Sequence, residues 1–325
     1  MQTLALIGAS LAGLSAARAA RSQGFTGRLV IIGDEPHRPY DRPPLSKDFL
    51  LGAIRAEDLF LETDADELAA EWVLGAEAAS LDASSRTVFL KDGRTIQADG
   101  IVIATGARAR RLPTLAGLSN VFTLRTLAYA QSLAPELVPG SRMAVIGAGF
   151  IGAEVAAAAA SRGMEVTMID TKPVPFAAQL GTEMGGVVAG LHAANGVELI
   201  SSAVIEDFYS GEGNVTGIRL AGGRYVAADV VVVGIGAEPN IGWLEGSGLE
   251  LRGGGGGGGG GRGRRTGVHL WPGLVAWSAA GRRVLPRREV SWRSRVSAPA
   301  AYRRGRGRSG SRRGRPDAVF PLPGR

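Results

Sequence analysis

The stretch "MAVIGAGFIGAEVAAAA", residues 143–159, predicts a buried strand that runs through a glycine-rich turn into a helix. Its apolar run ends at Gly147, and alanine-rich sequence with high helix propensity follows. A related stretch, "LALIGASLAGLSAARAA", occupies residues 4–20. The 325-residue chain therefore contains two copies of one strand–turn–helix unit.

A second β-rich run completes each unit as a βαβ motif. In the first copy the predicted strands are residues 3–7 and 28–32, with a helix over 11–22. In the second copy the strands are residues 143–146 and 165–169, with a helix over 151–162. Further strands are predicted at residues 87–90, 100–104, 197–208, 215–220 and 229–233, and a helix is predicted to start at Ser46. The pattern favours an α/β fold with two Rossmann-like dinucleotide-binding domains.

The second turn carries a complete dinucleotide-binding fingerprint. Glycine occupies all three required positions, Gly147, Gly149 and Gly152, and allows backbone N–H groups to approach a pyrophosphate closely. Asp170 follows at the end of the next strand, where a carboxylate binds an unphosphorylated ribose. No arginine lies between residues 170 and 176 to bind a 2′-phosphate, although Lys172 is close. The sequence therefore favours NADH over NADPH.

The first turn has serine in place of the middle glycine. The turn contains Gly8, Ser10, Ala12 and Gly13, and the small serine side chain has a hydroxyl that can bind a phosphate. Glu35 is the candidate acid for the ribose, with Asp34 as a close competitor. One such turn can simply allow a helix and a strand to pack closely. Two turns, each followed by an acid, favour two dinucleotide sites.

A series of motifs along the first 251 residues points to a known family. These are "GASLAGLSAA", "GDEPHRPYDRPPLSK", "IVIATGARAR", "LRTL", "VIGAGFIGAEVA" and "VVVGIGAEPN". In order and spacing the sequence resembles the FAD-dependent ferredoxin reductases of the putidaredoxin and rhodocoxin reductase group. That group lies within the pyridine nucleotide–disulfide oxidoreductase superfamily. The segment "PYDRPPLSK" is the most specific part of the resemblance.

The resemblance implies roles for the matching residues. The turn at residues 8–13 would hold the pyrophosphate of FAD, and Arg125 would contact FAD. Lys47 would lie near flavin N5 and pair with Glu154, which makes these two the candidate catalytic residues. Phe150 would lie where the nicotinamide stacks on the flavin. Without the resemblance, the favoured interpretations are ordinary ones: a solvated helix-terminal lysine for Lys47, a surface helix residue for Glu154 and a cation of the domain linker for Arg125.

The resemblance also implies domain boundaries. Residues 1–109 would form the first part of the FAD-binding domain, 110–235 the NAD(P)H-binding domain and 236–251 an incomplete return to the FAD-binding domain. Members of the family continue with a "T…A-x-G-D" segment and a C-terminal interface domain. Neither pattern follows residue 251 in this sequence. We therefore expect the chain to bind FAD weakly or to fold poorly.

The chain contains no cysteine, which excludes a thiol–disulfide relay and a protein-ligated iron–sulfur cluster. The reaction implied by the resemblance is then hydride transfer from NADH to FAD, followed by single-electron transfers to a [2Fe–2S] ferredoxin. The hydride step needs no protein acid or base, because the cofactor carries the chemistry. The alternative is an NAD(H)-binding protein that transfers no electrons.

Residues 252–325 form a low-complexity tail rich in glycine and arginine. The tail contains 18 arginines, no lysine and 2 acids, whereas the preceding 251 residues contain 19 basic and 28 acidic residues. Three interpretations stay open: a nucleic-acid-binding segment, a disordered linker, or translation out of frame. The complete lack of lysine disfavours selected phosphate binding, so nucleic acid is not the expected partner. The abrupt change to residues encoded by GC-rich codons favours the third interpretation.

The sequence gives no indication of membrane insertion or metal binding. The N-terminus lacks a basic segment followed by a long apolar core, and no apolar run approaches 18 residues. The three histidines, His37, His192 and His269, are far apart in the sequence. We expect a cytoplasmic protein with neither a membrane anchor nor a metal site.

Overall fold

The computed structural model describes residues 1–63, 66–249, 251 and 275–278. All of these residues belong to one compact unit, Met1–Val284. Apart from Val275–Ser278, the predicted low-complexity tail lies outside the described residues. No helix in the described ranges combines the length and the apolar character that a membrane span requires.

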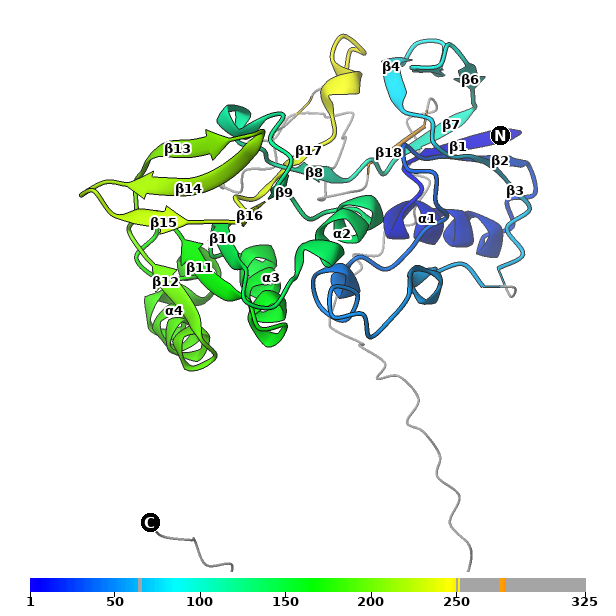
Figure 1. Ribbon diagram of the computed structural model, residues 1–325. Coiled ribbons are helices and arrows are strands. Elements are labelled where there is room, and N and C mark those ends of the chain that lie inside the picture. The colour runs from blue at the N-terminus through cyan, green and yellow to red at the C-terminus, as the bar shows by residue number, and fades with distance from the viewer. Residues whose placement is uncertain (64–65, 250, 252–274, 279–325) are drawn as a thin grey trace, which may run out of the picture. The chain divides into compact units, whose positions relative to one another are not determined.

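The first sheet has the strand order β18-β7-β1-β2-β3 (Figure 1). Its strands are β1 (Thr3–Ile7), β2 (Arg28–Ile32), β3 (Ala70–Val73), β7 (Gly100–Ile103) and β18 (Val275–Ser278). All neighbours are parallel except β18, which runs antiparallel to β7. Helix α1 (Leu11–Ser22) connects β1 to β2 and buries Leu14 and Ala17. This is the first predicted βαβ unit, with the predicted bounds.

Both faces of the first sheet are covered. Leu4 and Leu6 of β1 pack in one apolar cluster with Leu14 of α1, whereas Ala5 and Ile7 belong to a second cluster. The second cluster includes residues of an antiparallel sheet formed by β4 (Ala78–Asp82), β5 (Thr87–Leu90) and β6 (Thr95–Gln97). Burial on both sides explains why β1 and β2 are continuous apolar runs.

The second sheet has the order β12-β11-β10-β16-β9 and is parallel throughout. Its strands are β9 (Val121–Phe122), β10 (Arg142–Ile146), β11 (Glu165–Ile169), β12 (Val197–Ile200) and β16 (Val230–Val233). Helices α3 (Phe150–Ser161) and α4 (Ala177–Ala194) follow β10 and β11. An antiparallel sheet of β13 (Ile205–Gly211), β14 (Asn214–Leu220) and β15 (Tyr225–Ala227) shares a core cluster with β10 and β16. The second half therefore repeats the plan of the first.

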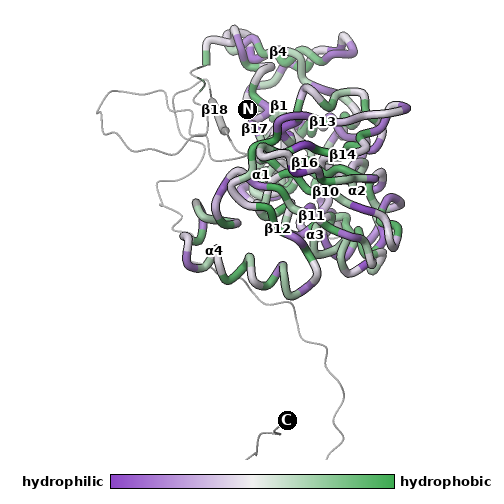
Figure 2. Tube along the Cα trace, turned by 60° about the vertical axis from the view of Figure 1, so that its left-hand side comes forward, coloured by the Kyte–Doolittle hydropathy of each residue, from purple (hydrophilic) through white to green (hydrophobic). Residues whose placement is uncertain are grey.

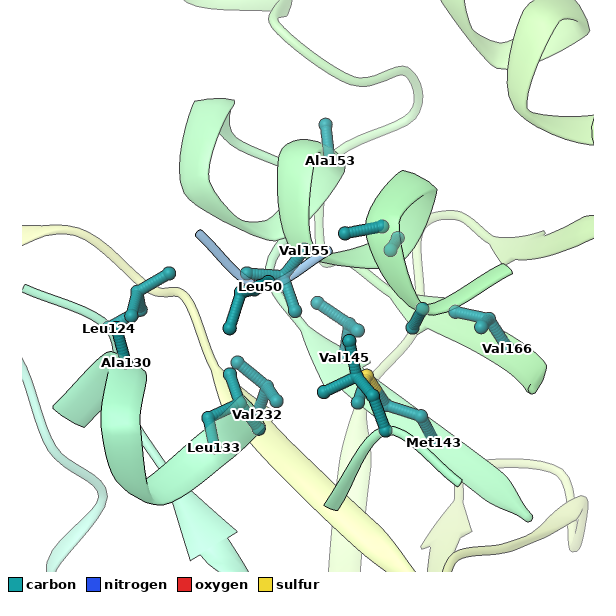
Figure 3. Close-up of a cluster of buried hydrophobic side chains, with 14 of the residues drawn as sticks. Leu50, Leu124, Ala130, Leu133, Met143, Val145, Ala153, Val155, Val166 and Val232 are labelled. Carbon is teal, nitrogen blue, oxygen red and sulfur yellow. The ribbon is translucent and has the colours of Figure 1, made fainter. Parts of the chain in front are cut away.

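Two further connections join the halves. Strands β8 (Ala107–Ala109) and β17 (Ala237–Pro239) pair in antiparallel fashion. The largest buried cluster contains Leu45 and Leu50 from the segment after β2, Leu133 from α2 (Leu127–Leu133) and Val155 from α3. Figure 3 shows part of this cluster. It holds the "PYDRPPLSK" segment against the helix that begins at the second glycine turn.

The prediction that a helix starts at Ser46 is wrong. Ser46 instead ends a 3-10 turn, Pro43–Ser46, and Lys47 has a φ of −127° and a ψ of −105°, outside the helical region. Two prolines at the start of the turn fix φ and supply no N–H groups. The chain therefore makes one tight turn and leaves the helical conformation at Lys47.

The predicted strand over residues 197–208 is two strands, β12 and β13, which belong to different sheets. Ser202 lies between them with a φ of 52°, in the left-handed region. A residue in this conformation ends the extended chain. The apolar residues on either side concealed the turn at the sequence level.

Helix α4 was not predicted from the sequence. Green segments recur along it in Figure 2, and its exposed large hydrophobic residues are Leu180, Met184, Val187 and Leu191. Gly181 interrupts the helix with a φ of 80°. The glycines of this segment, which are poor helix formers, hid the helical pattern.

Within the predicted low-complexity tail, Val275–Ser278 form a short strand, β18, against β7. Valine and tryptophan favour strands, and β7 would otherwise be an open edge of the first sheet. The remainder of the predicted tail lies outside the described residues.

Candidate functional site

The two glycine turns have the same close contacts. Gly8 has a φ of 124°, and a Cβ there would lie 2.1 Å from the carbonyl oxygen of Ala104 at the end of β7. A Cβ on Gly13 would lie 2.0 Å from the carbonyl oxygen of Gly8. Real Cβ atoms do not come this close to backbone. Glycine is therefore required at both positions by packing within the protein itself.

The second turn repeats these contacts with β16 in the place of β7. A Cβ on Gly147, whose φ is 103°, would lie 2.5 Å from the carbonyl oxygen of Gly234. A Cβ on Gly152 would lie 2.0 Å from the carbonyl oxygen of Gly147. The first and third glycines thus let α3 begin directly against the end of β10.

The middle position of the second turn is different, because no protein atom fills the space beside it. A Cβ on Gly149 would meet no atom within 4 Å, and its φ of −82° is open to any residue. Ser10, at the matching position, begins α1 in an extended conformation without capping the helix through its side chain. Both helices start with backbone N–H groups that have no partner within the helix, and α3 starts beside open space, an arrangement that fits a pyrophosphate.

Asp170 lies beside the second turn, as its position after β11 requires. Its Oδ2 accepts a hydrogen bond of 2.5 Å from Ala148 N–H, and its Oδ1 accepts one of 2.8 Å from Lys172 N–H. The predicted ribose acid therefore also stabilises the turn itself. The sequence did not predict this second role, because the partner Ala148 is an ordinary turn residue.

The candidate acids of the first site differ in their surroundings. Glu35 forms an ion pair of 2.6 Å with Arg42 and accepts a hydrogen bond of 2.5 Å from the hydroxyl of Tyr40. Asp34 is exposed. Tyr40 is buried, and this burial raises the pKa of its hydroxyl. Its oxygen also accepts a 2.9 Å hydrogen bond from Leu127 N–H at the start of α2, so the network spans both halves.

Arg125 lies next to this network. Its Nε donates a 3.0 Å hydrogen bond to the carbonyl of Ala107, and its own carbonyl accepts one of 2.8 Å from Arg42. Partial burial, and then the neighbouring Arg42, lower the pKa of Arg125. No carboxylate of the described residues forms an ion pair with it. A half-buried cation without a carboxylate fits the neighbourhood of an anionic ligand.

The structure brings Lys47 and Glu154 together. Nζ of Lys47 lies 2.8 Å from Oε1 of Glu154, near the start of α3. The Ser46 hydroxyl donates to the other oxygen of Glu154. The sequence identified the ion pair only through the family resemblance, and it did not identify Ser46. The available signal was the segment "PPLSK" as a whole. This pattern does not indicate which residue accepts a hydrogen bond from the Ser46 hydroxyl.

Phe150 is the first residue of α3, directly after Gly149, and 55% of its surface is exposed. Its ring centroid lies 4.7 Å from that of Phe176, which precedes α4 with a φ of 56°. An exposed aromatic ring at the mouth of the second turn can stack on a planar ligand. The sequence did not indicate Phe176, because no sequence pattern predicts a phenylalanine in the left-handed region.

Two similar α/β units, each with a glycine turn at the carboxyl end of its first strand, define a protein with two dinucleotide-binding folds. The family profile described as pyridine nucleotide-disulphide oxidoreductase matches residues 2–257. The chain therefore belongs to the pyridine nucleotide-disulphide oxidoreductase family.

Individual relatives agree with this assignment. The chain is 38% identical over 255 residues to rhodocoxin reductase of Rhodococcus erythropolis, with 78% of this chain and 60% of that protein covered. It is 38% identical over 250 residues to the ferredoxin–NAD(+) reductase subunit of the benzene 1,2-dioxygenase system of Pseudomonas putida, covering 76% and 60%. The chain thus spans about 60% of the length of these curated relatives.

A solved structure has the same fold. The putidaredoxin reductase in a covalent complex with putidaredoxin is 31% identical, with a TM-score of 0.74 over 77% of this chain and 62% of that one. The agreement supports the Rossmann-like architecture that the sequence predicted.

Substitution by alanine should distinguish Gly152, which packs closely against backbone, from Gly149, which has open space beside it. A methyl group at residue 152 would collide with the Gly147 carbonyl, whereas one at residue 149 meets nothing. We expect Gly152→Ala to lower the free energy of unfolding by about 1–3 kcal/mol, and Gly149→Ala to change it by less than about 1 kcal/mol. Urea unfolding followed by circular dichroism measures both. Equal destabilisation by the two variants would contradict the difference in packing.

Proposed function

We propose that this protein transfers electrons from NADH through FAD to a [2Fe–2S] ferredoxin-type acceptor. The observation that carries the proposal is the Lys47–Glu154 ion pair. It joins the segment between β2 and β3 of the first fold to the helix that starts at the second glycine turn. One contact thereby links the first fold to the start of α3. The names of the relatives, ferredoxin–NAD(+) reductase and rhodocoxin reductase, support the same reaction.

The first glycine turn, residues 8–13 with the start of α1, is the proposed FAD site and is called the first cradle. The turn with Gly8, Ser10, Ala12 and Gly13 would bind the pyrophosphate through the N–H groups that begin α1, and Arg125 would supply a cation. Glu35 or Asp34 would bind the ribose. When bound, FAD supplies a site that accepts two electrons as hydride and releases them singly. Lys47, held by Glu154, would place its ammonium group at the reacting end of the flavin.

The second glycine turn, residues 147–152 with the start of α3, is the proposed NADH site and is called the second cradle. The turn with Gly147, Gly149 and Gly152 would bind the pyrophosphate, and Phe150 would limit the space available to the nicotinamide. The Asp170 carboxylate favours a ribose with free hydroxyls, since a 2′-phosphate beside it would be repelled. This charge supports NADH over NADPH. A reaction that consumes NADH also fits a cytoplasmic setting.

The proposed acceptor is a one-electron carrier because the chain offers no thiol. Without cysteine, electrons cannot pass from the flavin to a disulfide of this chain. The structure of a related reductase in complex with putidaredoxin supports an iron–sulfur partner. The nature of the acceptor is therefore proposed from chemistry and from relatives together.

The direct test is reduction of the reconstituted chain. After incubation with FAD and gel filtration, the proposed function requires that the full chain keep visible flavin absorbance, despite the weak FAD binding expected from the sequence, and lose it when NADH is added without oxygen. A chain that retains FAD but is not bleached by NADH would fit an NAD(H)-binding protein without electron transfer. A chain that does not retain FAD would contradict the proposal for this polypeptide.

The open space beside Gly149 gives a test of the second site. A methyl group there would occupy the space proposed for the pyrophosphate while leaving the protein contacts intact. We expect Gly149→Ala to raise the Kd for NADH by about tenfold or more, equivalent to about 1.4 kcal/mol. Fluorescence titration measures the Kd, and Ser132→Ala, an exposed change on α2, is the control. An unchanged Kd would exclude this turn as the site.

The charge of Asp170 should decide between the two nicotinamide dinucleotides. We expect Asp170→Asn to reduce the preference for NADH over NADPH by about tenfold, because the repulsion of a 2′-phosphate disappears. Some affinity for NADH should also be lost, since Asp170 holds Ala148 N–H. Titration of the variant with each dinucleotide gives the ratio. A ratio identical to that of the unmodified chain would remove Asp170 from specificity.

A further inference from the structure

Ser46 is unusual because it is a polar side chain in the core. Among the described residues it is the single polar or charged residue that is buried, with 2% of its surface exposed. Leu45, its neighbour in the 3-10 turn, belongs to the large apolar cluster that includes α3. A buried hydroxyl without a hydrogen-bond partner destabilises the folded protein. Its hydrogen bond to Glu154 Oε2 satisfies the group.

Glu154 connects this buried hydroxyl to an ammonium group that is not buried. Its Oε1 pairs with Lys47 Nζ at 2.8 Å, and 48% of the Lys47 side chain is exposed. Lys47 has a flexible stem, and its other recorded partner is the Pro43 carbonyl at 3.3 Å. The ammonium therefore depends on the carboxylate for its place, and the carboxylate depends on the group that holds its far oxygen.

We propose that Ser46 is a positioning residue that orients Glu154 and, through it, places the Lys47 ammonium group. The purpose of that placement, at the reacting end of a flavin, rests on the proposed function. The placement itself belongs to the protein alone. It is therefore measurable without FAD.

The geometry explains why the hydroxyl is needed in addition to the ion pair. Two partners on the two oxygens of one carboxylate fix its rotation, whereas a single exposed ammonium leaves it free to turn. Ser46 is buried in the core, so it is the fixed end of the chain of contacts from Ser46 through Glu154 to Lys47. A displacement of about 1 Å in a reacting group can cost about a hundredfold in rate.

Amine labelling of the full chain without FAD measures the position of Lys47. The sequence has three lysines, Lys47, Lys91 and Lys172, which mass spectrometry resolves as separate peptides. Lys91 pairs with Glu77 at 2.7 Å and serves as the reference within each molecule. We expect Ser46→Ala to raise the Lys47:Lys91 labelling ratio about threefold or more, since a hydrogen bond to a charged group is lost. Ser46→Thr, which keeps the hydroxyl, should restore most of the protection.

A double variant tests whether Ser46 acts through Glu154. In the Glu154→Gln background, Ser46→Ala should change the labelling ratio by less than about 1.5-fold, because the carboxylate that it orients is gone. An equal change in both backgrounds, or an unchanged ratio in Ser46→Ala, would overturn the proposal. If circular dichroism shows that Ser46→Ala does not fold, Ser46→Cys replaces it, since cysteine has a similar volume and a weaker hydrogen-bond donor. Its Lys47:Lys91 labelling ratio should then rise in the same direction.

The FAD-loaded chain gives a second readout. We expect Ser46→Ala to slow flavin reduction by NADH about tenfold with the KM for NADH unchanged within about twofold, since the second cradle is not altered. A tenfold rise in the KM for NADH with an unchanged rate of flavin reduction would assign Ser46 to NADH binding and overturn the proposal. If NADH reduces no variant, the proposed function fails, while the labelling ratios still decide the role of Ser46.

Discussion

The close approach of each first helix to the strand before it is the constraint on which the remaining geometry depends. At Gly13 and Gly152 the helix backbone lies so near the preceding carbonyl that a Cβ would be 2.0 Å from it. This approach aims the free N–H groups of α1 and α3 at the carboxyl edges of their sheets. Because Glu154 lies near the start of α3, the same contact that shapes the second cradle also places this carboxylate.

The ion pair between Lys47 and Glu154 contributes little to stability by itself. Both side chains are partly exposed, and such pairs typically contribute about 0–1 kcal/mol. The apolar cluster of Leu45, Leu50, Leu133 and Val155 joins the two segments far more strongly. The pair is therefore a consequence of packing. Under the proposed function, its significance lies in holding the Lys47 ammonium group beside the start of α3.

The sequence predicted what depends on local pattern and missed what depends on distant partners. The strands and helices around both glycine turns follow from apolar runs and glycine spacing, and the structure confirms them. Helix α4 was hidden by its glycines, and the turn at Ser202 by the apolar residues around it. The partner of Ser46 is 108 residues away. No local pattern could reveal that contact or the hydrogen bond from Ala148 to Asp170.

The two cradles differ at one position, and this difference bears on why one chain has both. Ser10 places a hydroxyl beside the free N–H groups of α1, whereas Gly149 leaves only backbone at the start of α3. The half-buried Arg125 lies beside the Arg42–Glu35 pair that follows β2 of the first fold, whereas the exposed ring of Phe150 directly follows Gly149 at the second turn. Additional donors and a cation favour tight retention of a phosphate-bearing ligand. A turn with backbone donors alone, beside an exposed ring, suits a ligand that dissociates readily. Under the proposed function, FAD is the retained ligand and NADH is the ligand that binds and dissociates in each cycle.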